Sequence, residues 1–173
     1  MEENKKDNFI EEIKYMIPML AIAAVIVALD QWTKAMIRAK LATIGVSDVI
    51  RGFLEFSYSE NTGAAFGSFQ GKNAIFIVIG IVALVFIFYL FRSLNKSMWM
   101  RISFGLILGG ALGNLIDRIA FGFVTDFIRI RVTQSIWWPN FNIADAGITV
   151  GAIMFAVYKL VDTYRMSKSE EEE

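Results

Sequence analysis

The stretch Ile102-Ser-Phe-Gly-Leu-Ile-Leu-Gly-Gly-Ala-Leu-Gly-Asn-Leu-Ile-Asp-Arg118 decides the fold class of this chain. It carries no charge until its last two residues, an acid followed by a base. Gly105, Gly109 and Gly113 recur every four residues, so they lie on one helical face and allow a neighbouring helix to approach closely. We therefore predict a membrane-spanning helix over about residues 102–118 that packs against other helices.

Three further apolar stretches flank this one, at about residues 15–35, 73–91 and 142–161. Each is close to the length of about 20 residues that a membrane span requires. The chain is 55% hydrophobic, with a mean hydropathy of +0.50, which is more apolar than an ordinary soluble domain. We predict an α-helical polytopic membrane protein with four transmembrane helices in one membrane domain. A cleaved signal peptide is the alternative for the first stretch, but no clear small-residue cleavage site follows it.

The two long connections, residues 36–72 and 119–141, fall on the same side of the predicted membrane. Each contains a run in which apolar and polar residues alternate, Leu54–Ser59 in the first and Phe127–Val132 in the second. Such alternation is typical of strands with one buried face. We therefore predict a small extracytoplasmic β-sheet at the membrane surface.

The short connection on the opposite side determines the predicted orientation. It contains Arg92, Lys96 and Arg101 and no acid. Lys and Arg accumulate in cytoplasmic loops of membrane proteins. We therefore predict that this connection and both termini are cytoplasmic, so that the two long connections lie outside the cytoplasm.

The composition excludes several kinds of chemistry. The sequence contains no cysteine and no histidine, and its formal net charge is +0. Without cysteine there is no thiolate catalysis, no disulfide and no Cys-ligated zinc. Without histidine there is no Ser-His-Asp triad and no H-E-x-x-H metalloprotease. A neutral chain gives no support to a nucleic-acid partner, so hydrolysis here would use Asp/Glu chemistry or a Ser-Lys pair.

Four carboxylates lie at or between the predicted span ends, on the side of the long connections: Asp30, Asp117, Asp126 and Asp145. Carboxylates at membrane depth are costly and usually functional. Asp30 and Lys34 stand four residues apart in the order that favours a helical ion pair, so we predict that they hold a helix end together. Arg118 beside Asp117 would keep that carboxylate charged, which argues against Asp117 as a proton donor. Arg118 is then a candidate for binding an anionic or carbonyl group.

Asp126 and Asp145 have no such basic neighbour. Asp126 lies among apolar residues, and the nearest base after it is Arg129. Asp145 lies at the start of the fourth apolar stretch, where a helix N-terminus favours negative charge. Asp145 should therefore ionise more readily than Asp126, and two carboxylates with separated protonation states can act as base and acid.

Five short motifs occur in order along the chain: Asp30-Gln-x-Thr-Lys34, Asn61-Thr-Gly-Ala-Ala-Phe66, Gly109-Gly-Ala-x-Gly-Asn114-x-x-Asp117-Arg118, Val124-x-Asp126-Phe127 and Phe141-Asn-x-Ala-Asp145. Together they resemble the bacterial lipoprotein signal peptidase family, signal peptidase II, over roughly residues 28–151. The resemblance implies an inner-membrane protein with four transmembrane helices, a periplasmic β-cradle and cytoplasmic termini. It also implies an aspartic endopeptidase, without metal or cofactor, that cuts prolipoproteins just before the diacylglyceryl-modified cysteine.

The resemblance also implies roles for individual residues. The catalytic pair matches Asp126 and Asp145. Residues that line the substrate site match Asn61, Asn114, Arg118 and Asn142, and residues that support activity match Asp30, Lys34 and Asp117. Ala146 departs from the family pattern, because many relatives carry serine there. The implied partners are lipid-modified prolipoproteins and membrane lipids, and no oligomer is predicted.

Three other functions fit part of the sequence. A small ion- or proton-coupled transporter also carries acids in the membrane, but its site would lie near the midplane within internal repeats, and no repeat is visible. A Ser-Lys hydrolase would use Lys34, which already has Asp30 as a partner. A non-catalytic scaffold would give Asp126 and Asp145 no role.

Overall fold

The computed structural model describes residues 2–63, 71–93 and 97–171, and their side chains from 12–41, 45–63, 71–93 and 97–169. The Ala64–Phe66 part of one sequence motif, Lys96 and the side chains of the acidic tail lie outside these residues. Within them, four helices are long and apolar enough to cross a membrane. These are α1 (Glu2–Ile44), α2 (Asn73–Ser93), α3 (Met98–Phe121) and α4 (Ile143–Glu171).

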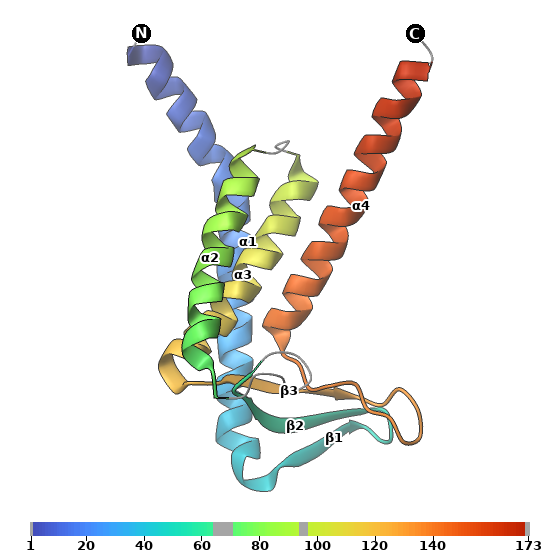
Figure 1. Cartoon of the computed structure of the whole chain (residues 1–173). Helices are drawn as coiled ribbons and strands as arrows, with labels where there is room; N and C mark the ends of the chain where they lie inside the picture. Colours follow the sequence, from blue (N-terminus) through green and yellow to red (C-terminus); the bar gives the residue numbers. More distant parts are fainter. Residues whose placement is uncertain (1, 64–70, 94–96, 172–173) are drawn as a thin grey trace.

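The helices form a bundle with a sheet at one end (Figure 1). The start of α1 and the end of α4 both lie at the opposite end. The sheet has three antiparallel strands in the order β1-β2-β3. Four apolar helices and a small sheet confirm the predicted fold class.

Helix α1 differs most from its predicted span of residues 15–35. It is one helix of 43 residues and continues to Ile44, well into the segment expected to form the first connection. The cause is packing against the sheet, because Ile37 and Leu41 are buried together with Phe127. The extra turns therefore attach α1 to the strand that carries Asp126.

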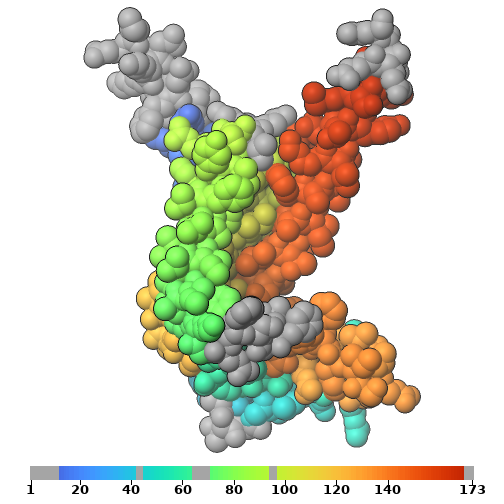
Figure 2. All heavy atoms as spheres, in the orientation of Figure 1, coloured from blue at the N-terminus to red at the C-terminus, as the bar shows by residue number. Residues whose placement is uncertain are grey.

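The strands are β1 (Val46–Ile50), β2 (Leu54–Asn61) and β3 (Val124–Ile130). The first alternating run lies within β2, and the second, Phe127–Val132, is a strand only as far as Ile130. Strand β1 was not predicted because all of its residues are exposed and its sequence does not alternate. The pairing of β2 with β3 is irregular, since Phe56 pairs with Ile128 but Ser59 pairs with Asp126. Such bulges are frequent next to active sites, where they re-aim a side chain. Figure 2 shows the sheet and the loop after β3 projecting to one side beyond the helices.

Glycines bring α3 close to α1 and to α4. A Cβ on Gly109 would lie 2.8 Å from the carbonyl oxygen of Ala23 in α1. A Cβ on Gly110 would collide with the carbonyl oxygen of Ala144 in α4, and one on Gly151 would lie 2.7 Å from that of Ser103. These approaches exclude larger side chains, which confirms the predicted packing role of the glycine pattern.

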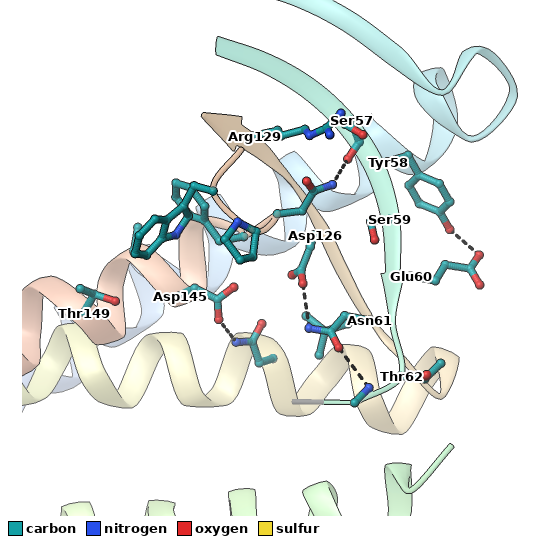
Figure 3. A pocket seen from close by; sticks show the side chains of 18 of the residues that line it. Ser57, Tyr58, Ser59, Glu60, Asn61, Thr62, Asp126, Arg129, Asp145 and Thr149 are labelled. Carbon is teal, nitrogen blue, oxygen red and sulfur yellow. Dashed lines mark hydrogen bonds between the residues drawn. The ribbon is translucent and has the colours of Figure 1, made fainter. Parts of the chain in front are cut away.

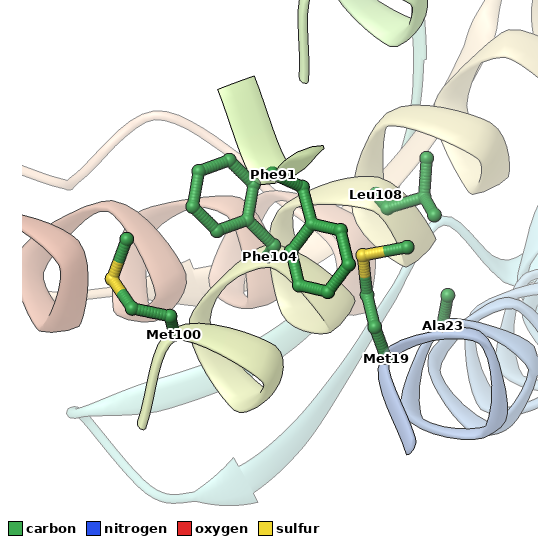
Figure 4. Close-up of a cluster of buried hydrophobic side chains, with 6 residues drawn as sticks. All are labelled: Met19, Ala23, Phe91, Met100, Phe104 and Leu108. Atoms are coloured by element: carbon green, nitrogen blue, oxygen red, sulfur yellow. The ribbon is translucent and has the colours of Figure 1, made fainter. Parts of the chain in front are cut away.

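The two ends of the bundle have different interiors. The end away from the sheet contains a cluster of buried apolar side chains (Figure 4): Met19, Ala23, Phe91, Met100, Phe104 and Leu108. The rings of Phe91 and Phe104 meet edge to face with centroids 5.7 Å apart. The end at the sheet contains most of the buried polar side chains: Asp30, Lys34, Asp117, Thr125, Asp126 and Asn142.

Candidate active site

A cavity of about 1000 Å³ lies where the sheet meets α3 and α4. Its walls come from β2, β3, α3, the segment before α4 and the first turns of α4. Five of the predicted site residues line it: Asn61, Asn114, Arg118, Asp126 and Asp145. Figure 3 shows the carboxylates of Asp126 and Asp145 directed into the same space. The other four, Asp30, Lys34, Asp117 and Asn142, lie behind the wall and do not line the cavity.

Asp145 is held by the start of α4. Its Oδ2 accepts from the backbone N–H of Asn142, 3.2 Å away, and its own N–H donates to Oδ1 of Asn142, 2.9 Å away. This reciprocal pair is a capping box, which satisfies backbone donors left free at a helix N-terminus. Oδ1 of Asp145 accepts from Nδ2 of Asn114 at 2.8 Å. Both carboxylate oxygens are therefore fixed while the group faces the cavity.

Asp126 is held by two amide side chains. Its Oδ2 accepts from Nδ2 of Asn61 at 2.9 Å, and its Oδ1 from Nδ2 of Asn142 at 2.7 Å. Asp126 is 3% exposed. Burial raises the pKa of this carboxyl to about 7, the charge of Asp145 adds to the rise, and the two amide hydrogen bonds oppose it. Asp126 therefore changes protonation near neutral pH, where a general acid or base works best.

Asn142 joins the two carboxylates. It is fully buried and contacts Asp126 through its side chain and Asp145 through its backbone N–H. Its Nδ2 also lies 3.1 Å from Oδ1 of Asn114. A single residue thus fixes the orientation of both acids.

An ionic cluster lies behind the cavity wall. Nζ of Lys34 is 2.8 Å from Asp30 and 3.6 Å from Asp117, and all three side chains are fully buried. This confirms the predicted Asp30–Lys34 ion pair. Oδ1 of Asp30 accepts from the N–H of Ala144 at 3.0 Å, which ties α1 to the first turn of α4. Lys34 also donates to Oδ1 of Asn114 at 2.9 Å, so its amine joins the ionic cluster to a residue that lines the cavity.

The cations in contact with Asp117 come from α1 and not from its sequence neighbour Arg118. They are Lys34 and Arg38, the latter at 3.3 Å. Neighbouring helical residues point about 100° apart, so Arg118 projects elsewhere. Its Nη2 donates to the carbonyl oxygen of Gly63 at 2.8 Å, and its guanidinium lies over the ring of Phe76. Arg118 therefore lines the cavity and binds a backbone carbonyl of the chain itself, and its predicted contact with an anionic or carbonyl group of a ligand stays a prediction.

Sequence reasoning missed Gln31, Arg38 and Thr125. Nε2 of Gln31 donates to the carbonyl oxygen of Gly113 at 3.0 Å, and Arg38 donates to the hydroxyl of Thr125 at 2.8 Å. Arg38 follows Lys34 by four residues, so it lies on the same helical face as the ion pair. That spacing was visible in the sequence, but the predicted span ended before it.

The rest of the cavity wall mixes polar and apolar side chains. Tyr58 donates to Oε1 of Glu60 at 2.8 Å, and burial together with this neighbour raises the pKa of the Tyr58 phenol to about 12. The phenol thus stays protonated at neutral pH. Arg129 also lines the cavity and pairs with Glu55 at 3.6 Å. In the part of the chain with described side chains, no three His, Cys, Asp or Glu residues are arranged to hold a metal ion.

Comparisons with known proteins identify the family of the chain. The family model described as Signal peptidase (SPase) II matches residues 22–161. The lipoprotein signal peptidase of Caldanaerobacter subterraneus is 42% identical over 135 residues, which are 78% of this chain and 90% of that protein. The one from Enterococcus faecalis is 35% identical over 150 residues, 86% of this chain and 91% of that protein.

Solved structures agree as well. A bacterial membrane enzyme, solved by the in meso method at 2.3 Å resolution, superposes with a TM-score of 0.76 at 37% identity. The match covers 84% of this chain and 88% of that one. With the family model matching most of its length, this membrane-embedded, multi-pass chain belongs to the signal peptidase II family of peptidases.

Proposed function

We propose that this protein is an aspartic endopeptidase that removes the signal peptide from diacylglyceryl-modified prolipoproteins, cutting before the lipidated cysteine. Asp126 and Asp145 are its catalytic pair. The observation that carries the proposal is that these two carboxylates face one cavity and share Asn142 as a hydrogen-bond donor. Membership of the signal peptidase II family supports the substrate class.

The two acids have different surroundings, which supports different roles. Asp145 lies in the first turn of α4, where the helix N-terminus favours a negative charge. Asp126, with its pKa raised to about 7, holds a proton at and below neutral pH. Asp145 therefore takes a proton from water, and the water oxygen bonds to the scissile carbonyl carbon. Asp126 gives its proton to the carbonyl oxygen at the same time.

The second half of the reaction restores both groups. The tetrahedral diol collapses, and the bond between carbon and the leaving nitrogen breaks. The proton held by Asp145 passes to that nitrogen, while Asp126 recovers a proton from the diol. Asn61, Asn114 and Asn142 keep the carboxylates oriented through both steps.

The position of the cavity suits a lipid-modified substrate. One wall is formed by Thr149 and Val150, two exposed residues of α4. In a bilayer this side of α4 faces lipid, so the acyl chains can remain among the lipids while the peptide enters. Apolar contacts of acyl chains contribute about 0.8 kcal/mol per buried CH₂. This free energy holds the substrate in the bilayer beside the enzyme, so the diacylglyceryl group raises the local concentration of the peptide at the cavity.

The orientation follows from charge. Arg92 lies in the last turn of α2 and Arg101 in the first turn of α3, at the bundle end opposite the sheet. Cationic residues at span ends favour the cytoplasm. The termini lie at this same end, so both are cytoplasmic and the catalytic carboxylates work near the outer face of the cytoplasmic membrane.

A gel-shift cleavage assay in liposomes tests the proposal. The substrates are a diacylglyceryl-modified prolipoprotein and its unlipidated form, and the enzymes are wild type, Asp126→Asn and Asp145→Asn, each checked for folding. Wild type should cleave only the lipidated form, and both folded variants should lose activity by about 10³-fold or more.

Other outcomes have equally clear meanings. Activity that survives either substitution moves catalysis away from the pair. If folded wild type cleaves neither substrate, the protease proposal is wrong, and the intramembrane acids then point to ion transport.

A further inference from the structure

We propose that Arg38 is a positioning residue for the reaction, acting on Asp126 from behind the cavity wall through Thr125. The inference rests on the proposed function, in that it takes Asp126 as a catalytic carboxylate. Arg38 itself does not line the cavity. Its side chain is 20% exposed and comes from the last part of α1.

Strand β3 places Thr125 and Asp126 on opposite faces. Successive side chains of a strand point to opposite faces. Asp126 faces the cavity, so Thr125 faces away from it, towards α1 and α3. Thr125 is fully buried. Whatever holds Thr125 on one side of the strand fixes the direction of Asp126 on the other.

The N–H, the hydroxyl and the carbonyl of Thr125 each make a hydrogen bond. Its N–H donates to Oδ2 of Asp117 at 2.9 Å, and its hydroxyl accepts from Nη1 of Arg38 at 2.8 Å. Its carbonyl oxygen accepts from Nδ2 of Asn142 at 3.4 Å. Thus α1, α3 and the residue before α4 all hold the residue that precedes Asp126.

Arg38 contacts both the Thr125 hydroxyl and Asp117, the carboxylate that binds the Thr125 N–H. Its Nη1 also lies 3.3 Å from Oδ1 of Asp117, and its guanidinium lies over the ring of Phe121 with 4.3 Å to the centroid. A planar guanidinium fixed by a ring and a carboxylate is a rigid donor. Arg38 therefore sets the position of both the carboxylate that binds the Thr125 N–H and the Thr125 hydroxyl.

The sheet does not do this alone. The β2–β3 pairing is irregular between Phe56 and Ser59, immediately beside the Ser59–Asp126 pair. A bulge disrupts the ladder locally, so the strand at Asp126 needs support from its other face. Small displacements of a catalytic group cost far more in rate than in binding.

The test compares kcat and KM in the liposome assay for Arg38→Met, Arg38→Lys, Thr125→Val and the double variant Arg38→Met/Thr125→Val. Arg38→Met should lower kcat about 10-fold or more, with KM changed less than about twofold. Arg38→Lys keeps a cationic donor but loses the planar guanidinium that lies over Phe121, so it should recover only part of the lost kcat. Because Arg38 acts through Thr125, the double variant should be no worse than about twofold below the poorer single variant.

Two controls separate the alternatives. Ser103→Ala removes another buried hydrogen bond, the one from Ser103 Oγ to the Gly151 carbonyl at 2.6 Å, and should lower stability with kcat unchanged. Asp126→Asn, measured beside wild type, tests the proposed function itself. If Asp126→Asn retains activity, the catalytic assignment fails regardless of Arg38.

Several results would overturn the inference while leaving the catalytic pair intact. One is wild-type kcat in Arg38→Met. Another is a raised KM with unchanged kcat, which would make Arg38 a substrate contact. A third is multiplicative loss in the double variant. If Arg38→Met does not fold, Thr125→Val decides the matter, because it should show the same kcat loss at unchanged KM and wild-type kcat would contradict the inference.

Discussion

Two groups of carboxylates lie at the sheet end of the bundle, and they differ in their partners. Asp30 and Asp117 contact the cations Lys34 and Arg38. The hydrogen-bond donors to Asp126 and Asp145, in the part of the chain with described side chains, are amide side chains and one backbone N–H. Lys34 and Arg38 place full positive charges beside Asp30 and Asp117, whereas the amides orient Asp126 and Asp145 through hydrogen bonds alone. The difference separates acids that hold the fold from acids that can react.

The largest effect should come from breaking the ionic cluster. Lys34→Met leaves Asp30 without its cation, and removal of one partner of a buried pair costs about 3–5 kcal/mol. Thermal unfolding in detergent measures it. Asp30→Asn/Lys34→Met should be less destabilised than Lys34→Met, because no unpaired charge then remains at Asp30 and Asp117 keeps Arg38.

Replacing the cavity acid Asp126 should not lower the unfolding temperature, in contrast to replacing Lys34. Above pH 7, burial disfavours the ionised form of Asp126, so Asp126→Asn should leave the unfolding temperature equal or higher. Destabilisation by Asp126→Asn, together with a neutral Lys34→Met, would reverse the assignment of the two groups.

The next largest effect is a loss of kcat when Asp145 is displaced relative to Asp126. A Cβ on Gly110 collides with the carbonyl oxygen of Ala144, in the turn of α4 that carries Asp145. Gly110→Ala should therefore lower kcat about 10- to 100-fold, since small misplacements are costly. Gly147→Ala is the matched control, because its Cβ would lie 3.3 Å from the Leu106 carbonyl oxygen, a contact that small shifts can relieve. Equal kcat values for the two variants would mean that α4 is free to shift without moving Asp145.

A smaller effect should appear in the pH dependence. If Asp126 is the acid, activity falls as pH rises through about 7, because the carboxyl loses its proton there. The Asn61 hydrogen bond lowers the pKa of Asp126. Asn61→Ala should therefore move the falling limb of the pH–rate profile to higher pH. Rates between pH 5 and 9 measure it, and a limb that stays fixed or moves down would show that Asn61 does not act on Asp126 in this way.

The raised pKa of Asp126 also affects the pH dependence of the protein's stability. The folded-state pKa of Asp126 lies above its ordinary value of 3.8. The group therefore contributes to stability fully below about pH 4, and this contribution is lost as pH rises through about 7. In Asp126→Asn this part of the pH dependence should be absent.

The fold class was predictable because apolar length and alternation are local properties of the sequence. The ion pair of Asp30 with Lys34 was predictable for the same reason, as the two lie one helical turn apart. The partners of Asp117 were not, because they come from α1 and depend on how two helices pack. The exposed strand β1 also lacked a signal, since no face of it is buried.

The candidate site was likewise predictable in part from the sequence. The catalytic assignment of Asp126 and Asp145 came from the motif resemblance, and it stays a prediction. Their convergence on one cavity depends on the capping box at Asn142 and on the bulge in β2, two features of the tertiary fold. Asn142 was expected to line the site, but it lies behind the wall and contacts both acids from within.

The smallest effect should come from a hydrogen bond far from both groups of acids. Nε1 of Trp99 donates to the carbonyl oxygen of Met154 at 2.8 Å, and Trp99 is 45% exposed. This bond joins α3 to α4 near the apolar end of the bundle, as Asn114 and Asp145 join them near the sheet. Trp99→Phe keeps the ring and removes the donor, so it should cost about 1 kcal/mol or less. Because α4 is held at its other end by the capping box and by Asp30, kcat should not change. A loss of kcat in Trp99→Phe, measured beside its unfolding temperature, would mean that the far end of α4 controls the position of Asp145 and that the cavity acids are less locally fixed than their hydrogen bonds indicate.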